Sequence, residues 1–332
     1  MSENLIEVKH LTKRFPVKKG LFSSGLFGQQ RKYVHAVNDV SFNVRKGEVL
    51  SLVGESGCGK STTARTMIRL YEPDEGQVLF DGTDISHLDD KGMQPFRRRF
   101  QMIFQNPYSS LNPRQTIKEI LTEALLFHKI AANPKEAEQK TYSLLQRVGL
   151  RPEQADRYPH QFSGGQRQRI SIARALAVNP DFIIADEPVS ALDVSIQAQI
   201  LNLLLDIREE FNLSYLFIAH NLAVVRYISD RIAVMYLGTI VELATEKEIF
   251  ANPLHPYTKA LFASVPVLGE KLEQPSIQGD TPSTPIDFPK GCVFYKRCPF
   301  ATAICKEQKP KMKEYEKGHF VACHRIENGG DI

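Results

Sequence analysis

The sequence predicts an α/β fold built on a mainly parallel sheet, with a helical insertion and a proline-rich C-terminal tail. Two observations lead to this prediction. Short apolar runs of strand length, such as Glu48–Val53 and Phe182–Ala185, alternate with segments in which apolar residues recur every three or four positions. A glycine-rich motif follows the first of these runs, as expected where a buried parallel strand turns into a helix.

The elements can be placed in chain order from the same patterns. Alternating, strand-like residues cover 5–15 and 33–53, and a polar, glycine-containing insertion at 18–32 separates them. The pattern then predicts helices over 61–71 and within 116–148, a strand at 182–185, a helix with the apolar stripe 196, 200, 203, 204 and 207, and strands at 215–219 and 232–236. Beyond about residue 250, prolines exclude long regular elements and predict a tail wrapped around a core. They are Pro253, Pro256, Pro266, Pro275, Pro282, Pro285 and Pro289.

Composition and charge set broad limits on the class of protein. The chain has 332 residues, of which 42% are hydrophobic and 24% charged, which excludes a wholly disordered, collagen-like or coiled-coil protein. The net charge of +4 neither requires nor excludes an acidic partner. No apolar run approaches membrane-spanning length, and the first residues lack a basic segment followed by an apolar one. We therefore expect a cytosolic protein whose role at a membrane depends on partners.

The motif from Gly54 to Ser61 fits the phosphate-loop pattern G-x-x-x-x-G-K-[ST]. Its glycines let backbone N–H groups turn towards phosphate oxygens, and the N-terminus of the following helix points at the anion. Lys60 supplies a charge to the β- and γ-phosphates, while the Ser61 hydroxyl can bind Mg²⁺. We interpret Cys58 inside this loop as a small residue tolerated at a variable position of the motif rather than as a redox switch. The expected nucleotide contacts are Gly54, Glu55, Ser56, Gly57, Cys58, Gly59, Lys60, Ser61 and Thr62.

A second acidic site follows the apolar run at 182–185. Asp186 and Glu187 stand where a parallel strand ends, at the edge at which doubly wound sheets bind ligands. A strand can also end in merely solvated acids, but the phosphate loop favours a metal site. Asp186 would then hold Mg²⁺ through its water shell, and Glu187 would polarise the attacking water.

A third motif distinguishes between classes of phosphate-loop protein. Ser163 suits a helix N-cap, and Gly164 and Gly165 leave the first amides of the helix available to a phosphate. Gln166 completes this signature, which Phe162 precedes. A second anion site in one ATPase chain makes sense if it serves a nucleotide held by another subunit.

With these motifs the sequence resembles the ATP-binding subunits of ABC transporters. The signature Ser163–Gln166 precedes Asp186 by 20 residues, as in that family. Gln105 matches the family's glutamine loop, residues 190–193 its D-loop and His220 its switch histidine. The resemblance implies a RecA-like phosphate-loop core, an antiparallel β-subdomain and a helical subdomain at about 106–178, together forming a nucleotide-binding domain over 1–250.

The resemblance also implies roles for single residues. Gln105 would sense Mg²⁺ and the γ-phosphate, His220 would contact the γ-phosphate and orient the water together with Glu187, and Asp193 would belong to the nucleotide site. Family members stack adenine on an aromatic residue near the N-terminus. Tyr33, close to the strand that normally follows this residue, is favoured over Phe15.

The tail at 251–332 resembles a narrower branch, the oligopeptide and dipeptide importers. The stretch Asn252–Leu261, together with Phe104–Pro113, is similar to the second, F-type ATPase of such systems. The resemblance implies a second ABC ATPase as heterodimer partner, two membrane permease subunits, and indirectly a peptide-binding protein outside the membrane. It places the chain on the cytoplasmic face of the membrane and implies no nucleic-acid partner.

Four cysteines crowd into the tail, and in a reducing cytosol such a cluster indicates a metal site more than disulfides. They are Cys292, Cys298, Cys305 and Cys323. Their spacing fixes no metal, because thiolate-rich sites select zinc or iron–sulfur clusters alike. Members of this branch can carry a [4Fe–4S] cluster here, so the resemblance favours iron over zinc. The role would be to clamp the tail.

Three alternatives remain open at this point. The same ATPase could drive a nickel or other small-solute importer. A soluble ABC-type ATPase acting on nucleic acid usually has two cassettes or a long coiled coil, and this chain has neither. A phosphate-loop phosphotransferase would need an acceptor other than water, and the signature Ser163–Gln166 argues against it.

Overall fold

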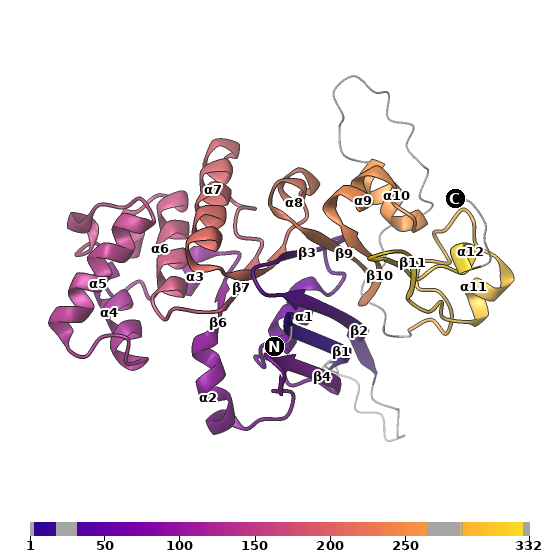
Figure 1. Cartoon of the computed structure of the whole chain (residues 1–332), viewed down its shortest axis with the longest axis horizontal. Helices are drawn as coiled ribbons and strands as arrows, with labels where there is room; N and C mark the ends of the chain where they lie inside the picture. The colour runs from indigo at the N-terminus through magenta and orange to yellow at the C-terminus, as the bar shows by residue number, and fades with distance from the viewer. Residues whose placement is uncertain (1–2, 18–31, 264–285, 287, 328–332) are drawn as a thin grey trace, which may run out of the picture. The chain divides into compact units, whose positions relative to one another are not determined.

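The computed structural model describes residues 3–17, 32–263, 286 and 288–327 (Figure 1). The predicted insertion, except for Lys32, and four of the tail prolines at 266, 275, 282 and 285 lie outside the described residues. The chain divides into two compact units. The first unit comprises residues 1–43, 50–87 and 220–332, and the second unit comprises 44–49 and 88–219.

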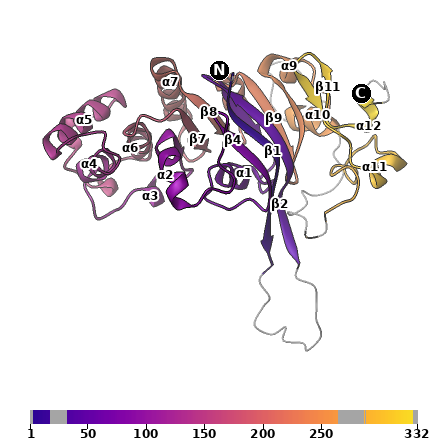
Figure 2. The same ribbon diagram turned by 60° about the horizontal axis from the view of Figure 1, so that its bottom comes forward.

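The first unit contains an antiparallel sheet in the strand order β2-β1-β4-β5. Figure 2 shows the long strands β1 and β2 running side by side. Their bounds are β1 Asn4–Pro16, β2 Tyr33–Arg45, β4 Glu75–Phe80 and β5 Thr83–Asp84. Ile6 and Val8 of β1 are buried on one face, because alternate side chains of a strand point to the same face. This sheet is the antiparallel β-subdomain that the resemblance implied.

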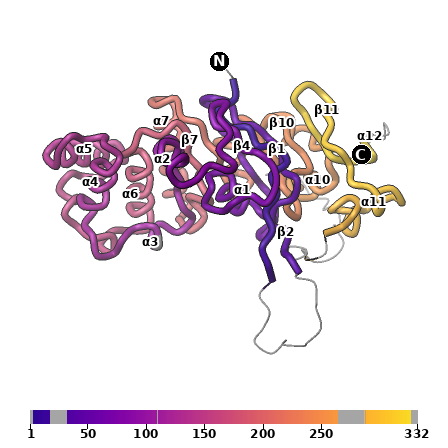
Figure 3. The backbone as a smooth tube through the Cα atoms, turned by 90° about the horizontal axis from the view of Figure 1, so that it is seen from below, coloured from indigo at the N-terminus to yellow at the C-terminus, as the bar shows by residue number. Residues whose placement is uncertain are grey.

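A second run of strands in the first unit has the order β11-β12-β10-β9-β3. Its members are β3 Val49–Val53, β9 Arg231–Tyr236, β10 Thr239–Thr245, β11 Lys313–Glu316 and β12 His319–Val321. Strand β3 pairs with β9 in parallel and all five of its residues are buried, as the apolar run predicted. The remaining pairs are antiparallel, so the tail adds a hairpin to this sheet (Figure 3).

A buried carboxylate fastens the C-terminal region to β10. Glu242 has no exposed surface and accepts hydrogen bonds from the backbone N–H groups of Leu254 (2.7 Å) and His255 (2.8 Å). The ring nitrogen Nε2 of buried His319 lies 2.8 Å from its Oε1. A carboxylate in a buried position is stable only when such donors replace its water. No pattern in the sequence had indicated this cluster.

Short helices complete the first unit, and one of them differs from its predicted length. Helix α1 follows the phosphate loop but ends at Met67 rather than at residue 71, because Arg69 adopts φ of 61°, a left-handed conformation that stops a helix. The helices are α1 Lys60–Met67, α8 Leu222–Ile228, α9 Glu246–Ala251, α10 Pro256–Ala263, α11 Ala303–Glu307 and α12 His324–Glu327.

The second unit contains three parallel strands in the order β8-β7-β6. Their bounds are β6 Phe100–Ile103, β7 Phe182–Asp186 and β8 Ser214–Ile218. Strands β7 and β8 are completely buried, in agreement with their continuous apolar sequence. The carboxyl ends of these strands lie at one edge, which is where Asp186 and Glu187 follow β7.

Helices make up the rest of the second unit, including the predicted helical insertion (magenta in Figure 1). They are α2 Asp90–Arg99, α3 Pro107–Ser110, α4 Ile117–Phe127, α5 Pro134–Arg147, α6 Gly164–Leu176 and α7 Val194–Phe211, with short 3₁₀ turns η1 Pro152–Gln154 and η2 Pro159–Gln161. Helix α7 buries four of the five predicted stripe residues, at 200, 203, 204 and 207.

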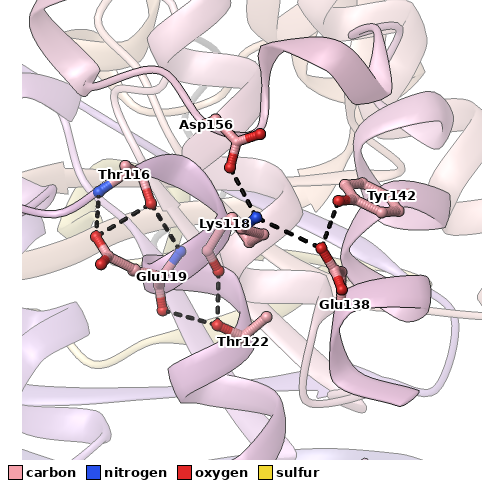
Figure 4. Close-up of polar contacts among 7 residues, drawn as sticks. All are labelled: Thr116, Lys118, Glu119, Thr122, Glu138, Tyr142 and Asp156. Carbon is pink, nitrogen blue, oxygen red and sulfur yellow. Dashed lines mark hydrogen bonds and ion pairs between the residues drawn. The ribbon is translucent and has the colours of Figure 1, made fainter. Parts of the chain in front are cut away.

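A polar network joins α4, α5 and the chain near η1 on the surface of the second unit (Figure 4). Thr116 and Glu119 form a capping box at the start of α4. The Lys118 ammonium lies 2.7 Å from Asp156 and 3.4 Å from Glu138. Because these side chains are largely solvated, the network orders the surface more than it stabilises the fold.

Candidate nucleotide-binding site

The phosphate loop of the first unit connects β3 to α1 in a conformation that requires glycine. Gly54 and Gly59 adopt φ of 150° and 108°. A Cβ atom at Gly54 would lie 2.1 Å from the carbonyl oxygen of Met235, and one at Gly59 would lie 2.1 Å from that of Ala36. The backbone of this loop therefore passes directly over its neighbours, and no other residue type fits at either position.

Lys60 is almost fully buried and its ammonium is already oriented by the loop. Its Nζ donates to the carbonyl oxygens of Gly54 (2.8 Å) and Glu55 (3.0 Å). Ser61 and Thr62 follow in the first turn of α1, behind the Gly59 N-cap. A positive charge and a helix N-terminus thus converge at the end of β3, which is the arrangement that binds phosphate groups.

The remaining positions of the loop are consistent with a backbone cradle. Ser56 and Gly57 form the outer turn, in which Gly57 has φ of 78°. Cys58 is buried, and burial raises the pKa of its thiol, with Lys60 acting in the opposite direction. A buried, protonated thiol is a poor nucleophile, as the interpretation of Cys58 as a tolerated small residue requires.

The two candidates for stacking adenine have different surroundings. The ring of Phe15 is engaged with Tyr71 in an edge-to-face contact, with centroids 5.3 Å apart, and Lys13 lies over it at 5.5 Å. Tyr33, at the start of β2, is 38% exposed. An exposed ring can offer its face to a base, so this difference favours Tyr33.

In the second unit, two of the predicted catalytic residues contact each other. The side-chain amide of Gln105 donates from Nε2 to Oε2 of Glu187 over 2.8 Å. Glu187 has φ of 49°, and its N–H donates to the carbonyl oxygen of Ile218 on the neighbouring strand (2.9 Å). The hydrogen bond to the neighbouring strand holds this left-handed conformation, which turns the chain directly after buried Asp186. His220 is exposed and follows the end of β8 by two residues.

The signature residues cap α6, as predicted. The Ser163 hydroxyl accepts from the backbone N–H of Gln166 (3.3 Å), and the Gln166 side chain accepts in return from the backbone N–H of Ser163 (3.0 Å). Phe162 is buried and anchors the turn. A Cβ at Gly164 would meet only Leu192, at 3.5 Å, whereas one at Gly165 would lie 2.5 Å from Ile196.

The D-loop, residues 190–193, leads from β7 into α7. The Ser190 hydroxyl donates to the carbonyl oxygen of Glu187 (3.1 Å), which ties the start of the D-loop to the predicted general base. Asp193 is exposed and is the N-cap residue of α7, without a side-chain capping bond. Its carboxylate is therefore accessible at the surface of the second unit.

The four tail cysteines line one cavity of about 280 Å³ in the first unit, together with Phe294 and His255. The backbone N–H of Cys292 donates to the carbonyl oxygen of Cys305 (2.7 Å), closing the loop between them. Burial raises the pKa of Cys292 to about 12 and also raises those of Cys298 and Cys323. Within the described residues, no three His, Cys, Asp or Glu side chains are grouped so that they could hold a metal ion.

Two functional contacts of the phosphate loop could not be found from the sequence. The Tyr257 hydroxyl accepts from the backbone N–H of Glu55 (2.9 Å), and the Arg297 guanidinium pairs with the Glu55 carboxylate. Both partners come from the C-terminal region, more than 200 residues away in the chain. No local spacing signals a contact of this kind.

None of the helices in the described part of the chain has the length and apolarity needed to cross a membrane. A family model described as "ABC transporter" matches residues 37–190, and one described as "Oligopeptide/dipeptide transporter, C-terminal region" matches residues 241–305.

Relatives match along nearly the whole chain. The oligopeptide transport ATP-binding protein AppF of Bacillus subtilis is 56% identical, with 97% of each chain covered. The dipeptide transport ATP-binding protein DppF of Haemophilus influenzae is 47% identical, again with 97% of each chain covered. Among solved structures, the ATP-binding cassette MJ0796 in a dimeric, post-hydrolysis state with ADP and Pi gives a TM-score of 0.63 at 31% identity, covering 73% of this chain and 98% of that one. The chain therefore belongs to the ABC transporter family and carries the C-terminal region of the oligopeptide/dipeptide transporters.

Proposed function

We propose that this chain is the ATP-hydrolysing subunit of a membrane importer and couples ATP binding and hydrolysis to the uptake of dipeptides and oligopeptides. The observation that carries the proposal is the phosphate loop. Its backbone admits only glycine at Gly54 and Gly59, and it orients the ammonium of Lys60. The relatives named for oligopeptide and dipeptide transport, at 56% and 47% identity, support the choice of substrate.

The nucleotide is bound by residues 54–62, with backbone N–H groups on the phosphates and Lys60 on the β- and γ-phosphates. The Ser61 hydroxyl and Gln105, with Asp186 through the water shell of the metal, would hold Mg²⁺, which would neutralise charge on the phosphates. The exposed ring of Tyr33 stacks on adenine.

Hydrolysis uses Glu187 to polarise the attacking water, with His220 contacting the γ-phosphate. The Gln105–Glu187 hydrogen bond supports this assignment, because an amide donor orients the carboxylate without taking its charge away. Gln105 thereby links the metal ligands to the base, so a change at the γ-phosphate alters the loop that contains Gln105.

The signature residues Ser163 to Gln166, together with Asp193, contact a nucleotide bound to a second ABC ATPase subunit. The exposed N-terminus of α6 and the accessible Asp193 carboxylate support this assignment. The partners are this second ATPase, in a heterodimer, and two membrane permease subunits, which receive the peptide from a binding protein outside the membrane. The chain then lies peripherally on the cytoplasmic face of the membrane.

The four tail cysteines would hold a [4Fe–4S] cluster, which would clamp the C-terminal region. All four thiols line the same cavity, and burial keeps three of them protonated unless a cation compensates their thiolates. A zinc ion needs four sulfurs about 2.3 Å from one point. A [4Fe–4S] cluster would likewise take all four cysteine thiolates, and the four thiols that line this cavity of about 280 Å³ would supply them.

The ATPase is tested by purifying this chain with its membrane subunits and measuring phosphate release. We expect release that depends on ATP and Mg²⁺ and that rises when the peptide-loaded binding protein is added. Lys60→Ala should abolish it, because the phosphate loop loses its charge. Transfer of phosphate to a small molecule instead of water would contradict the proposal.

The cluster is tested separately by anaerobic purification, followed by assays of iron, acid-labile sulfide and zinc. We expect about four irons and four sulfides per chain. Cys298→Ser should lose them, whereas Cys58→Ser, which removes a cysteine outside the cavity, should keep them. About one zinc per chain without sulfide would refute the cluster and leave the ATPase assignment untouched.

A further inference from the structure

Glu55, the second residue of the phosphate loop, is held by a bidentate ion pair from the C-terminal region. Nη1 of Arg297 lies 2.9 Å from Oε2 of Glu55, and Nη2 lies 3.1 Å from Oε1. The Arg297 side chain is 9% exposed and the Glu55 side chain 22%, so water screens this pair far less than a surface pair. Two parallel N–H···O bonds fix the direction of the carboxylate as well as its distance.

The backbone of Glu55 is held by a second residue from the same region. The hydroxyl of Tyr257, a fully buried residue on α10, accepts the N–H of Glu55 over 2.9 Å. The C-terminal region therefore fixes this residue at both its main chain and its side chain. A partly buried N–H that lost this acceptor would lose its hydrogen bond, at a cost in free energy.

The position of Glu55 determines where the two acceptors of Lys60 lie. Lys60 donates to the carbonyl oxygens of Gly54 and Glu55, which belong to the peptide groups on either side of the Glu55 Cα atom. A rotation of Glu55 moves both carbonyl groups, and with them the ammonium that meets the phosphates. The contact of Arg297 with Glu55 therefore affects the position of the Lys60 ammonium in the proposed nucleotide site.

The same contact leads back to the cysteine cavity. Arg297 precedes Cys298, and its N–H donates to the carbonyl oxygen of Phe294 in a tight turn (3.0 Å). The Phe294 ring lines the cavity and packs on Tyr236 and Tyr257, at centroid distances of 5.2 Å and 5.5 Å. A continuous set of buried side chains therefore joins the cavity to the phosphate loop, all within the first unit.

We propose that Arg297 is a positioning residue for ATP, acting through Glu55, and that the folded cysteine loop thereby sets the affinity of the phosphate loop for nucleotide. Tyr257 supports the same residue from its backbone side. This inference rests on the proposed nucleotide site at residues 54–62. It adds a dependence of that site on the C-terminal region, which the phosphate-loop motif itself does not contain.

The experiment measures ATP affinity and steady-state hydrolysis for the full chain in complex with its partner subunits. Arg297→Gln should raise the Kd and KM for ATP about tenfold, which corresponds to about 1.4 kcal/mol, while kcat at saturating ATP changes less than about twofold. Arg297→Lys should recover part of the affinity, because lysine restores the positive charge but cannot form the two parallel hydrogen bonds to the carboxylate. Lys309→Gln is the control, since it cuts another ion pair between the tail and the core, Lys309–Asp39 (2.7 Å), in which no residue of the phosphate loop takes part. It should change neither constant.

A double-mutant cycle separates positioning from general stability. Glu55→Gln should weaken ATP binding by a similar factor, and the double variant with Arg297→Gln should be no weaker than either single variant. If Arg297→Gln does not fold, Tyr257→Phe combined with Arg297→Lys provides the same readout. An unchanged Kd in Arg297→Gln, or an equal loss in Lys309→Gln, would overturn the inference. A wild-type chain that failed to bind ATP would instead overturn the proposed function, so the two failures are distinct.

Discussion

The phosphate loop at residues 54–61 and the signature at residues 163–166 both place glycines at the start of a helix, yet they are supported in different ways. The signature is held by its own residues, since Ser163 and Gln166 satisfy each other in a capping box. The phosphate loop is held by Tyr257 and Arg297, which stand far away in the sequence. One glycine-containing turn is therefore encoded locally, and the other is assembled by the fold of its unit.

This difference has a functional meaning under the proposed assignments. A turn that meets a partner's nucleotide can be carried by a helix alone, because the partner subunit supplies the rest of the site. A loop that must bind the negatively charged phosphates of ATP needs its backbone and its lysine fixed beforehand. The C-terminal region supplies that support to the phosphate loop.

The largest expected effect concerns chemistry and not either turn. Glu187→Gln keeps the shape of the residue but removes the carboxylate, so kcat should fall on the order of 10²-fold to 10⁴-fold. ATP affinity should stay within about twofold, because neither loop is altered. Phosphate release and nucleotide binding measured on the same preparation check this, and full activity would remove Glu187 from the mechanism.

Glycine substitutions test the comparison itself. Gly59→Ala places a Cβ 2.1 Å from the Ala36 carbonyl oxygen at φ of 108°, so ATP affinity should fall more than tenfold. Gly164→Ala meets only Leu192, at 3.5 Å, and should leave both the melting temperature and ATP binding by the separate chain unchanged. Equal losses in the two variants would show that the turns do not differ as described.

The next effect tests how the C-terminal region is fastened. Glu242→Gln replaces a buried acceptor of three hydrogen bonds with a group that presents an N–H₂ to one of those donors. The free energy of unfolding should fall by about 2–4 kcal/mol. Urea denaturation followed by circular dichroism gives the loss, and ATP affinity should fall with it because Tyr257 and Arg297 are carried by the same region. Stability equal to that of the wild type would mean that this cluster does not hold the tail.

The smallest effect is expected on the surface of the second unit. Glu138→Gln weakens the contacts of Glu138 with Lys118 and Tyr142 in the network of Figure 4. The hydrogen bonds from Tyr142 and Lys118 lower the pKa of Glu138, but solvent screens these exposed groups. The melting temperature should therefore stay the same within error. A clear decrease would show that the surface network contributes to the stability of the chain.

Local patterns predicted the parts of the molecule that local physics determines. Buried strands β3 and β7, the phosphate loop and the Ser163 cap all follow from a few neighbouring residues. The early end of α1 was missed, since the left-handed conformation of Arg69 has no glycine to signal it. The pairing of β12 with β10 was also missed, because the tail strands are only four and three residues long and β12 is held to β10 by the contact of His319 with Glu242.

The same distinction between features set by local sequence and features set by tertiary folding applies to the candidate site. Each motif residue was predictable from spacing, but the contact of Gln105 with Glu187 across 82 positions, and those of Tyr257 and Arg297 with Glu55, depend on tertiary folding. Sequence spacing carries no information on such pairs unless they belong to a known motif. For this reason the sequence predicted the residues that we propose to bind nucleotide, but not what holds them in place.

The most direct test of the account is peptide uptake by vesicles. The complex containing this chain is reconstituted with ATP on the side of the ATPase subunits, and a labelled oligopeptide with its binding protein is placed on the other side. We predict that peptide accumulates only with hydrolysable ATP and that Glu187→Gln abolishes uptake while the complex still binds ATP. Accumulation at the same rate in the Glu187→Gln complex, or ATP hydrolysis with no peptide movement, would contradict the central claim that this chain drives peptide import.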